Sequence, residues 1–207
     1  MNGVSATLGF ALVFGASLAH AEQAGAEQDW EVKIGAHVVD PKSDNGTLAA
    51  GALRTKVGDS WRPTVTLEYR ATRNLGIEIL AAAPFEHDVK LNGAVAAKVK
   101  QLPPTLSLQW HFLPDQRFDP FVGVGLNFAR FFSIDEKGPL AGTQLELGDS
   151  WGVAAHAGVE YAIADRWSLT VDARWIKLST DAKVNGAKVG SVDIDPLVYG
   201  FAIGYRF

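Results

Sequence analysis

The chain ends on the stretch Leu197-Val198-Tyr199-Gly200-Phe201-Ala202-Ile203-Gly204-Tyr205-Arg206-Phe207, in which every second residue is large and apolar or aromatic. Most of the residues between them are small. Successive side chains of a strand point to opposite faces, so this alternation predicts a β-strand with one apolar face. A half-buried strand of a soluble protein alternates as well, but rarely over such a long aromatic series that stops on a terminal Phe. The stretch therefore favours a strand that faces lipid.

The same alternation recurs along the chain and predicts eight strands. Helical spacing of apolar residues, three and four apart, is almost absent. Most of the segments have the length that a tilted membrane strand needs. The expected strands are residues 30–39, 61–70, 75–85, 105–112, 121–130, 151–162, 167–178 and 197–207.

The connections between these strands alternate between short and long. The short ones are residues 71–74, 113–120 and 163–166, and the long ones are 40–60, 86–104, 131–150 and 179–196. Short periplasmic turns and long outer loops are typical of outer-membrane barrels, and eight is an allowed strand number. The predicted fold class is therefore all-β: an eight-stranded antiparallel transmembrane up-and-down β-barrel.

The outward-facing aromatic residues fall at the strand ends once this topology is adopted. The periplasmic girdle would hold Trp30, Tyr69, Trp110, Phe112, Tyr161, Trp167, Tyr205 and Phe207. The outer girdle would hold Trp61, Phe85, Phe128, Trp151, Trp175 and Tyr199. Aliphatic residues such as Val65, Ile79 and Val171 occupy the middle of the same face, as a lipid-facing band requires. A soluble lipocalin-like barrel would show the opposite parity.

The inward parity collects charged residues, five acidic and five basic. They are Glu31, Lys33, Arg62, Glu68, Arg70, Glu78, Glu160, Asp172, Arg174 and Arg206. Buried charges are tolerated when they are paired, so we expect an internal salt-bridge network that fills the barrel. Proton or ion conduction is the less favoured interpretation. Most of these residues lie toward the periplasmic end.

The inward positions nearer the outer end are mostly apolar or small. The expected channel-lining residues are Leu80, Ala82, Val39, Phe131, Ile176 and Val198. Side chains can fill an eight-stranded barrel, so an open aqueous pore is not expected. The pattern predicts a cup that is apolar above and closed below by charge.

Prolines mark one place where the barrel wall could be interrupted. Pro84 lies near the outer end of the third expected strand, and Pro103 and Pro104 precede the fourth. Proline cannot donate to a strand ladder. One hypothesis is a lateral gap through which an apolar solute passes into the lipid; the alternative is that these prolines only end strands.

Two of the long loops share a short motif. Lys90-Leu91-Asn92-Gly93-Ala94 is similar to Lys183-Val184-Asn185-Gly186-Ala187. Asn-Gly between alternating residues is a strong hairpin signal. We expect both loops to extend the barrel as hairpins above the membrane.

The N-terminal residues resemble a signal peptide. A short apolar run from Leu8 to Leu18 precedes Ala19-His20-Ala21, a small-x-small cleavage pattern. We therefore expect residues 1–21 to be a cleaved signal peptide and residues 22–207 to form one barrel domain. The chain has no Cys, which excludes disulfides and thiol chemistry, and its net charge of −4 gives no indication of nucleic-acid binding.

Several stretches together resemble the OmpW/AlkL family of outer-membrane proteins. They are Asn74-Leu75-Gly76-Ile77-Glu78, Ala81-Ala82-Ala83-Pro84-Phe85, Leu102-Pro103-Pro104-Thr105-Leu106, Pro120-Phe121-Val122-Gly123-Val124-Gly125-Leu126-Asn127, Asp149-Ser150-Trp151-Gly152, Asp195-Pro196 and Gly204-Tyr205-Arg206-Phe207. The resemblance spans essentially the whole mature chain in order. It implies an eight-stranded barrel of the Gram-negative outer membrane whose hydrophobic channel does not run straight to the periplasm.

The resemblance also implies a function: passive uptake of small hydrophobic molecules, released laterally into the membrane. Leu80 is the residue carried over to the channel, whereas Arg174 stands where the family can place a large apolar residue. The alternative is a non-conducting structural or receptor barrel whose loops act as an adhesin or bind phage or bacteriocin. The expected partners are outer-membrane lipid and lipopolysaccharide, a small hydrophobic solute and, through Phe207, the barrel assembly machinery.

An enzymatic function is not expected. Ser107 and His111 share the inner face of one strand but are four residues apart, roughly 13 Å by strand rise. That separation is too long for a nucleophile and its base. We therefore expect no catalytic residue, no cofactor and no metal site.

Overall fold

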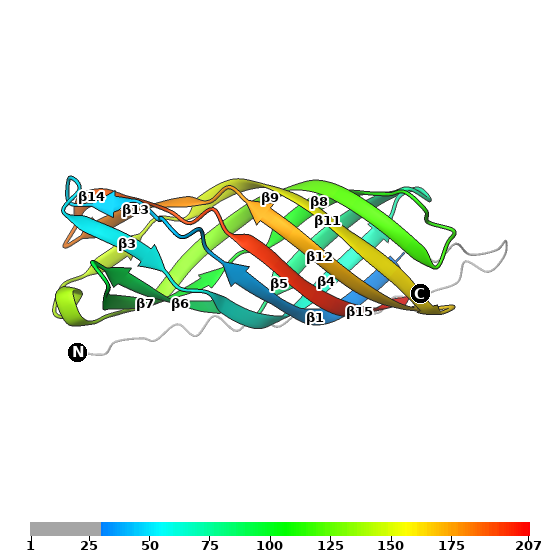
Figure 1. Cartoon of the computed structure of the whole chain (residues 1–207), viewed down its shortest axis with the longest axis horizontal. Coiled ribbons are helices and arrows are strands. Elements are labelled where there is room, and N and C mark those ends of the chain that lie inside the picture. The colour runs from blue at the N-terminus through cyan, green and yellow to red at the C-terminus, as the bar shows by residue number, and fades with distance from the viewer. Residues whose placement is uncertain (1–29) are drawn as a thin grey trace, which may run out of the picture.

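A computed structural model describes residues 30–207, and these residues form a closed antiparallel β-barrel (Figure 1). The barrel strands are β1 (Trp30–Asp40), β4 (Ser60–Arg70), β5 (Leu75–Ala82), β8 (Thr105–His111), β9 (Phe118–Glu136), β11 (Ser150–Ala164), β12 (Trp167–Ile176) and β15 (Leu197–Arg206). Each strand pairs with the next in this order, and β15 pairs with β1. The predicted eight-stranded barrel is therefore confirmed. The expected signal peptide, residues 1–21, lies outside the described residues.

The C-terminal strand closes the barrel. β15 lies between β12 and β1, and its register places Arg206 opposite Glu31 and Val198 opposite Val39. Its large alternate residues, including Phe201, face outward, while the small residues between them face the interior. The alternation in this strand therefore separates a lipid face from a lumen face.

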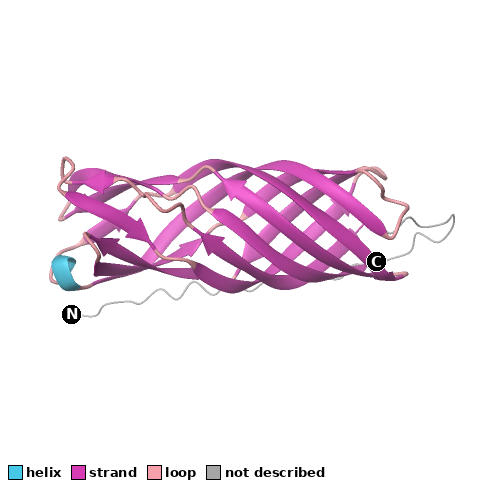
Figure 2. Cartoon of the chain, viewed as in Figure 1, coloured by secondary structure: helices cyan, strands magenta, loops and turns pink. Residues whose placement is uncertain are grey.

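The long loops fold into an outer extension, a set of short elements that continues beyond one end of the barrel. Its elements are β2 (Thr47–Leu48), β3 (Leu53–Val57), β6 (Phe85–Leu91), β7 (Ala94–Leu102), β10 (Leu145–Leu147), the 3-10 helix η1 (Gly138–Leu140), β13 (Ser179–Val184) and β14 (Ala187–Asp193). Figures 1 and 2 show this outer extension at the end opposite the C-terminus. β7 continues the barrel sheet by pairing with the outer half of β9, and β6 pairs with β7 and β3, whereas β10, β13 and β14 form a separate three-stranded sheet. The long loops thus lengthen the barrel.

Both Asn-Gly motifs form the expected hairpin turns. Asn92 and Gly93 have φ of 48° and 87° between β6 and β7, and Asn185 and Gly186 have φ of 50° and 80° between β13 and β14. Positive φ at both central residues is the type I′ geometry that suits the twist of a two-residue hairpin.

The third strand ends earlier than predicted, and this corrects one aromatic assignment. β5 stops at Ala82, and Phe85 begins β6. Phe85 was expected in the outward girdle, but it is 2% exposed and packs in the interior. The physical reason is Pro84, which has no backbone N–H to donate to a neighbouring strand and therefore ends β5. Phe85 belongs to the next strand, so the alternation of faces along β5 does not predict which way it points.

The outer wall of the barrel carries the predicted lipid-facing pattern. Trp61 and Trp151 lie at the outer ends of their strands with 64% and 72% of their surface exposed. Ile34 and Val124, nearer the middle, are similarly exposed. Such a continuous apolar exterior with aromatic ends is suited to a bilayer. Within residues 30–207, no helix is long and apolar enough to cross a membrane.

Candidate functional site

The periplasmic half of the barrel is filled by an ion-pair cluster around Lys33. The Lys33 Nζ lies 2.7 Å from Glu68, 2.9 Å from Glu160 and 3.7 Å from Glu31. These four side chains come from β1, β4 and β11, and each has at most 2% of its surface exposed. The three carboxylates approach within 4.8 Å of one another. The ammonium group between them compensates the repulsion that such a cluster would otherwise suffer.

Two arginines balance the remaining negative charge of the three carboxylates. Arg70 Nε lies 2.8 Å from Glu68, and its Nη2 lies 3.3 Å from Glu160. Arg206, from the last strand, pairs with Glu160 and lies 3.5 Å from Glu31. The cluster therefore joins strands that are far apart in sequence and closes the lower lumen.

A second ion-pair group lies around Arg174. Its Nη2 is 2.7 Å from Glu78 and 3.9 Å from Asp172, and its Nη1 donates to the Ser107 hydroxyl at 3.4 Å. Asp172 also lies 2.9 Å from His37 Nε2. Arg174 is 2% exposed, so it caps the charged half from above and does not extend into solvent.

Arg62 is the one predicted network member that the structure places elsewhere. Its Nε donates to the Pro84 carbonyl at 2.9 Å, and its Nη1 donates to the Trp61 carbonyl at 2.8 Å. It forms no ion pair with any described residue. Parity had placed Arg62 on the inner face, but its position at the outer end of β4 keeps it away from the acidic cluster near the other end.

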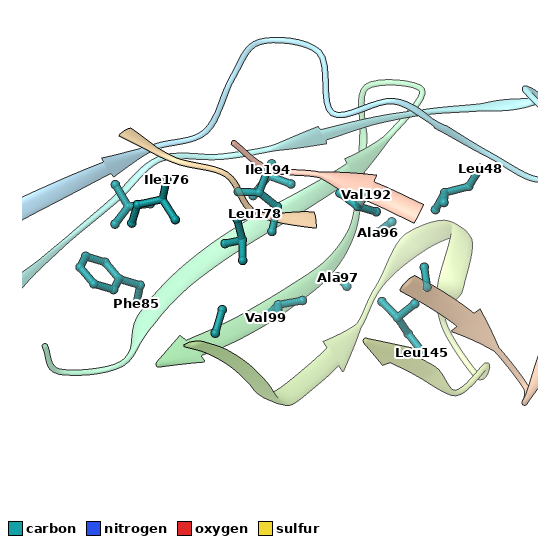
Figure 3. Close-up of a cluster of buried hydrophobic side chains, with 14 of the residues drawn as sticks. Leu48, Phe85, Ala96, Ala97, Val99, Leu145, Ile176, Leu178, Val192 and Ile194 are labelled. Atoms are coloured by element: carbon teal, nitrogen blue, oxygen red, sulfur yellow. The ribbon is translucent and has the colours of Figure 1, made fainter. Parts of the chain in front are cut away.

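The outer extension encloses an apolar cavity of about 200 Å³. Its wall is almost entirely hydrocarbon and is built from β2, β3, β6, β7, β9, β10, η1, β13 and β14, with Phe131 of β9 among the lining residues. Figure 3 shows the surrounding hydrophobic cluster, which runs from Phe85 and Ile176 at one end to Leu48 and Leu145 at the other. An apolar cavity of about 150 Å³ stays dry and binds benzene, so this one has room for a small apolar molecule.

A smaller cavity of about 20 Å³ lies between the upper cavity and the charged half. Five of the six predicted channel-lining residues contribute to its wall: Leu80, Ala82, Val39, Ile176 and Val198. Gln101 lines both cavities, and Arg174 lines the lower one. This volume is close to that of a single water molecule. The interior therefore narrows from the upper cavity toward Arg174.

The hydrogen-bond ladder of the wall is interrupted beside this lower cavity. The last β5–β8 pair is Leu80 with Thr105, and pairing resumes in β6–β7 with Phe85 and Gln101. Residues 81–84 and 102–104, which we call the proline break, lie between these pairs. All three predicted prolines belong to it, and Pro103 and Ala81 also line the lower cavity.

Several carbonyl groups of the proline break accept hydrogen bonds from side chains, and the Pro104 carbonyl also accepts one from the Phe128 N–H of β9 at 3.0 Å. Arg62 binds the Pro84 carbonyl, and the Asn127 amide donates to the carbonyls of Pro103 and Pro104 at 3.0 and 3.2 Å. Side-chain hydrogen bonds satisfy buried carbonyls as well as a ladder does. The interruption of the ladder is therefore stabilised by specific hydrogen bonds.

Comparison with known proteins shows the family. Residues 26–207 match the OmpW family over nearly the whole chain. The chain belongs to the OmpW family. It is a non-enzymatic family of outer-membrane barrels of Gram-negative bacteria, so the expected fold, location and absence of an enzymatic role all agree with this membership.

Individual relatives agree with the family assignment. The chain is 36% identical to outer membrane protein W of Escherichia coli (strain K12) over 205 residues, which cover 95% of this chain and 94% of that protein. The crystal structure of OprG from Pseudomonas aeruginosa matches with a TM-score of 0.79 and 29% identity, covering 86% of this chain and 95% of that one. The solid-state NMR structure of AlkL in DMPC bilayers has the same fold, with a TM-score of 0.66, 24% identity and coverage of 91% and 95%.

The polar interior of this OmpW-family barrel also contains three histidines and one aspartate that are not among the residues predicted for the salt-bridge network. His111 lies 2.9 Å from Glu68 and 2.7 Å from Asp119, and His156 Nε2 lies 2.9 Å from the Gln109 amide oxygen. His37 meets Asp172 as described above. The histidines stand at inward parity, which was the available signal, whereas Asp119 was expected in a turn and belongs to β9.

Proposed function

We propose that this OmpW-family barrel is a channel for passive uptake of small hydrophobic molecules across the outer membrane. A solute enters the apolar upper cavity, passes Leu80 and leaves sideways into the membrane at the proline break. The single observation that carries the proposal is the sequence of chambers along one axis: an apolar cavity, a constriction beside an interrupted wall, and a charged plug below.

The charged plug argues against a straight route to the periplasm. An eight-stranded barrel is narrow enough for side chains to fill it. Lys33 and its carboxylate partners fill the lower lumen with buried ion pairs. Breaking these pairs would leave buried charges without a partner. An apolar solute could enter this region only by separating these ion pairs, and it would offer the charged groups no hydrogen bond in return.

The lateral route is supported by the position of the proline break. Leu80 and Pro103 line the same small cavity, so the constriction and the interrupted ladder are adjacent. Passage at this place breaks no strand-to-strand hydrogen bond between residues 81–84 and 102–104, because none joins them. The family resemblance points to the same class of solute and the same exit.

The alternative of a non-conducting receptor barrel predicts a filled upper interior. The side chains of the outer extension leave about 200 Å³ unfilled, which favours transport. A receptor function uses the loop surface and needs no such cavity.

Uptake of a fluorescent hydrophobic probe into proteoliposomes tests the proposal. Wild type should accelerate uptake over empty vesicles, and Leu80→Arg should abolish the acceleration because a guanidinium group would occupy the small cavity. Leu80→Ala is the matched control and should retain uptake, since it keeps the position apolar. A correctly folded wild type that fails to accelerate uptake would instead favour the receptor barrel.

A second substitution tests the exit. Pro84→Val restores a backbone N–H at the proline break and should slow uptake by permitting the ladder to continue. If Pro84→Val takes up probe as fast as wild type while Leu80→Arg is inactive, the cavity is on the path but the exit lies elsewhere.

We also propose three partners besides the solute: outer-membrane lipid, lipopolysaccharide and the barrel assembly machinery. The machinery would recognise the C-terminal Phe207, whose side chain is exposed while its backbone N–H binds the Trp30 carbonyl at 3.0 Å. Phe207→Ala should lower the amount of assembled barrel in cells while leaving in vitro refolding unchanged. Equal assembly in cells would argue against this role.

A further inference from the structure

The upper cavity is apolar, but three polar side chains stand in its wall: His87, Gln101 and Thr180. Thr180 is satisfied, because its hydroxyl donates to the Gly148 carbonyl at 2.6 Å. The other two differ. His87 Nε2 and Gln101 Oε1 are both buried and have no hydrogen-bond partner among residues 30–207. His87 is 3% exposed and Gln101 is 2% exposed.

The hydrogen bond at the other ring nitrogen determines what His87 Nε2 can do. His87 Nδ1 lies 2.7 Å from the Gly58 carbonyl, which only accepts hydrogen bonds, so Nδ1 carries the proton. Burial lowers the pKa of His87 below its ordinary value of 6.5, and the positive charge of Arg62 lowers it further, against the opposing effects of the Gly58 hydrogen bond and of Asp59. The ring is therefore neutral at pH 7, and Nε2 presents a lone pair.

The two unpartnered acceptors occupy one patch of the wall. Phe85 pairs with Gln101 and His87 pairs with Val99, so His87 and Gln101 are diagonal neighbours on the same face of β6 and β7. Diagonal residues of an antiparallel pair are about 7–8 Å apart. Gln101 also lines the lower cavity, so the patch lies where the two cavities meet.

Unpaired buried acceptors are uncommon because each forfeits a hydrogen bond that water would have supplied. A ligand with an O–H group can donate to either atom, and the soft terminal torsion of Gln101 lets its oxygen turn toward such a donor. A pure hydrocarbon leaves both acceptors unpaired. A charged ammonium donor would have to shed its hydration against a hydrocarbon wall.

We infer that the upper cavity prefers neutral apolar molecules that carry a hydroxyl group, small alcohols or phenols, which donate a hydrogen bond to His87 Nε2 or Gln101 Oε1. This inference rests on the proposed function and names its substrate class. Discrimination arises because a site with polar groups rejects the isostere that cannot satisfy them.

Phenol and toluene test this preference, because they have nearly the same shape and differ in a hydroxyl against a methyl group. Their dissociation constants can be measured from amide shifts of β6 and β7 by NMR on the full barrel in nanodiscs. In wild type, phenol should move these amides. The variant Gln101→Leu with His87→Phe should weaken phenol about tenfold, as expected for one lost hydrogen bond, and leave toluene within twofold.

Thr180→Val is the matched control. It removes a polar group from the same cavity whose hydrogen bond is already made within the protein, so it should change the phenol to toluene ratio by less than twofold. Gln101→Leu alone is the second variant in case His87→Phe disturbs folding, because Gln101 makes no hydrogen bond that the fold requires through its oxygen. It should lower phenol affinity by about threefold.

The outcomes separate the inference from the proposed function. Selective loss of phenol binding in the variants supports the hydroxyl preference. Equal changes for phenol and toluene, or none, overturn it while leaving the hydrophobic channel intact. If neither molecule shifts the amides of wild type, the cavity is not a ligand site and both proposals fail.

Discussion

The two halves of the barrel interior share one set of strands but are filled in opposite ways. The periplasmic half is closed by charges that meet at distances such as 2.7 Å between Lys33 and Glu68. The outer half, together with the outer extension, is lined by aliphatic residues and retains a cavity of about 200 Å³. β9 and β12 contribute to both halves, so the difference comes from the side chains and not from the backbone.

The difference teaches what each kind of filling requires. A buried charge must be placed within hydrogen-bond distance of its partner, which leaves little room for empty space. An apolar side chain gains from any apolar contact and has no preferred direction. The charged half can therefore form a tight plug, while the apolar half can tolerate a cavity that a solute fills.

Removing the central cation should have the largest effect on this contrast. Lys33→Met leaves three buried carboxylates within 4.8 Å without the ammonium group between them. We expect the free energy of unfolding to fall by about 3–5 kcal/mol. Urea titration of the refolded barrel in vesicles would measure it.

Lys56 offers the matched control for this substitution. Lys56 lies on β3 in the outer extension, is exposed and makes no ion pair with a described residue. Lys56→Met should change stability by no more than about 0.5 kcal/mol. A Lys33→Met barrel as stable as Lys56→Met would show that the plug does not depend on its ion pairs.

A double-mutant cycle at Arg174 and Glu78 asks whether the plug needs charge at all. Arg174→Met leaves Glu78 buried without its 2.7 Å partner and should cost about 3 kcal/mol. Adding Glu78→Leu should restore stability to within about 1 kcal/mol of wild type, because an apolar pair can replace a buried ion pair. Denaturant midpoints of the four proteins give the coupling energy. If the losses of stability from the two substitutions simply add, Arg174 and Glu78 do not stabilise the barrel as a pair.

Gly93→Ala should destabilise only the outer extension. Gly93 has a φ of 87°, and no atom lies within 4 Å of an added Cβ, so the cost is conformational and is about 1 kcal/mol. Amide hydrogen exchange in β6 and β7 should become several-fold faster while β1 and β15 are unchanged. Gly148→Ala, also in the outer extension, is the control because an added Cβ would meet its nearest atom at an ordinary 4.0 Å. Faster exchange throughout the barrel would show that the two halves do not respond separately.

The smallest expected effect concerns the protonation of His87. Its pKa is lowered by burial, so an NMR titration should place its midpoint below 6.5. Just below pH 6.5, His87 binds a proton in the unfolded chain but stays neutral in the folded chain. The stability contributed by the neutral ring is therefore complete above that pH and is lost as the pH falls toward the folded value.

Arg62→Met sharpens the His87 titration. Removing this nearby positive charge should raise the His87 pKa toward 6.5. A midpoint at or above 6.5 in wild type would mean that the ring is not buried in the outer extension as the structure describes.

Sequence alternation predicted the strands well because the signal is local. Residues of β15 alternate between lipid and lumen within a single stretch, and no distant residue is needed to read that pattern. The prediction failed at Phe85, since Pro84 separates two strands and the parity of one does not carry into the next. It failed at Arg62 as well, because parity gives a face of the barrel but not which residues across the lumen are within reach.

The candidate site was predicted in part. Six inward residues near the outer end were expected to share a channel wall, and the structure gathers five of them around one small cavity. The cavity above them is formed chiefly by the long loops, whose pairing with β9 and with one another had no signal beyond the two Asn-Gly turns. The role of His87 and Gln101 was not foreseen, because an unpaired buried atom is recognised only after every neighbour is placed.

Taken alone, the sequence determined the number of barrel strands, the face that most strand residues present and the segregation of charge toward one end. These properties depend on the order of residues within a strand. Only the tertiary structure decided that Lys33 meets Glu68 and Glu160, which lie 35 and 127 residues further along the chain. Strand tilt and stagger bring such residues together, and a cavity is the volume that their packing leaves over. Neither is a property of any single stretch of sequence.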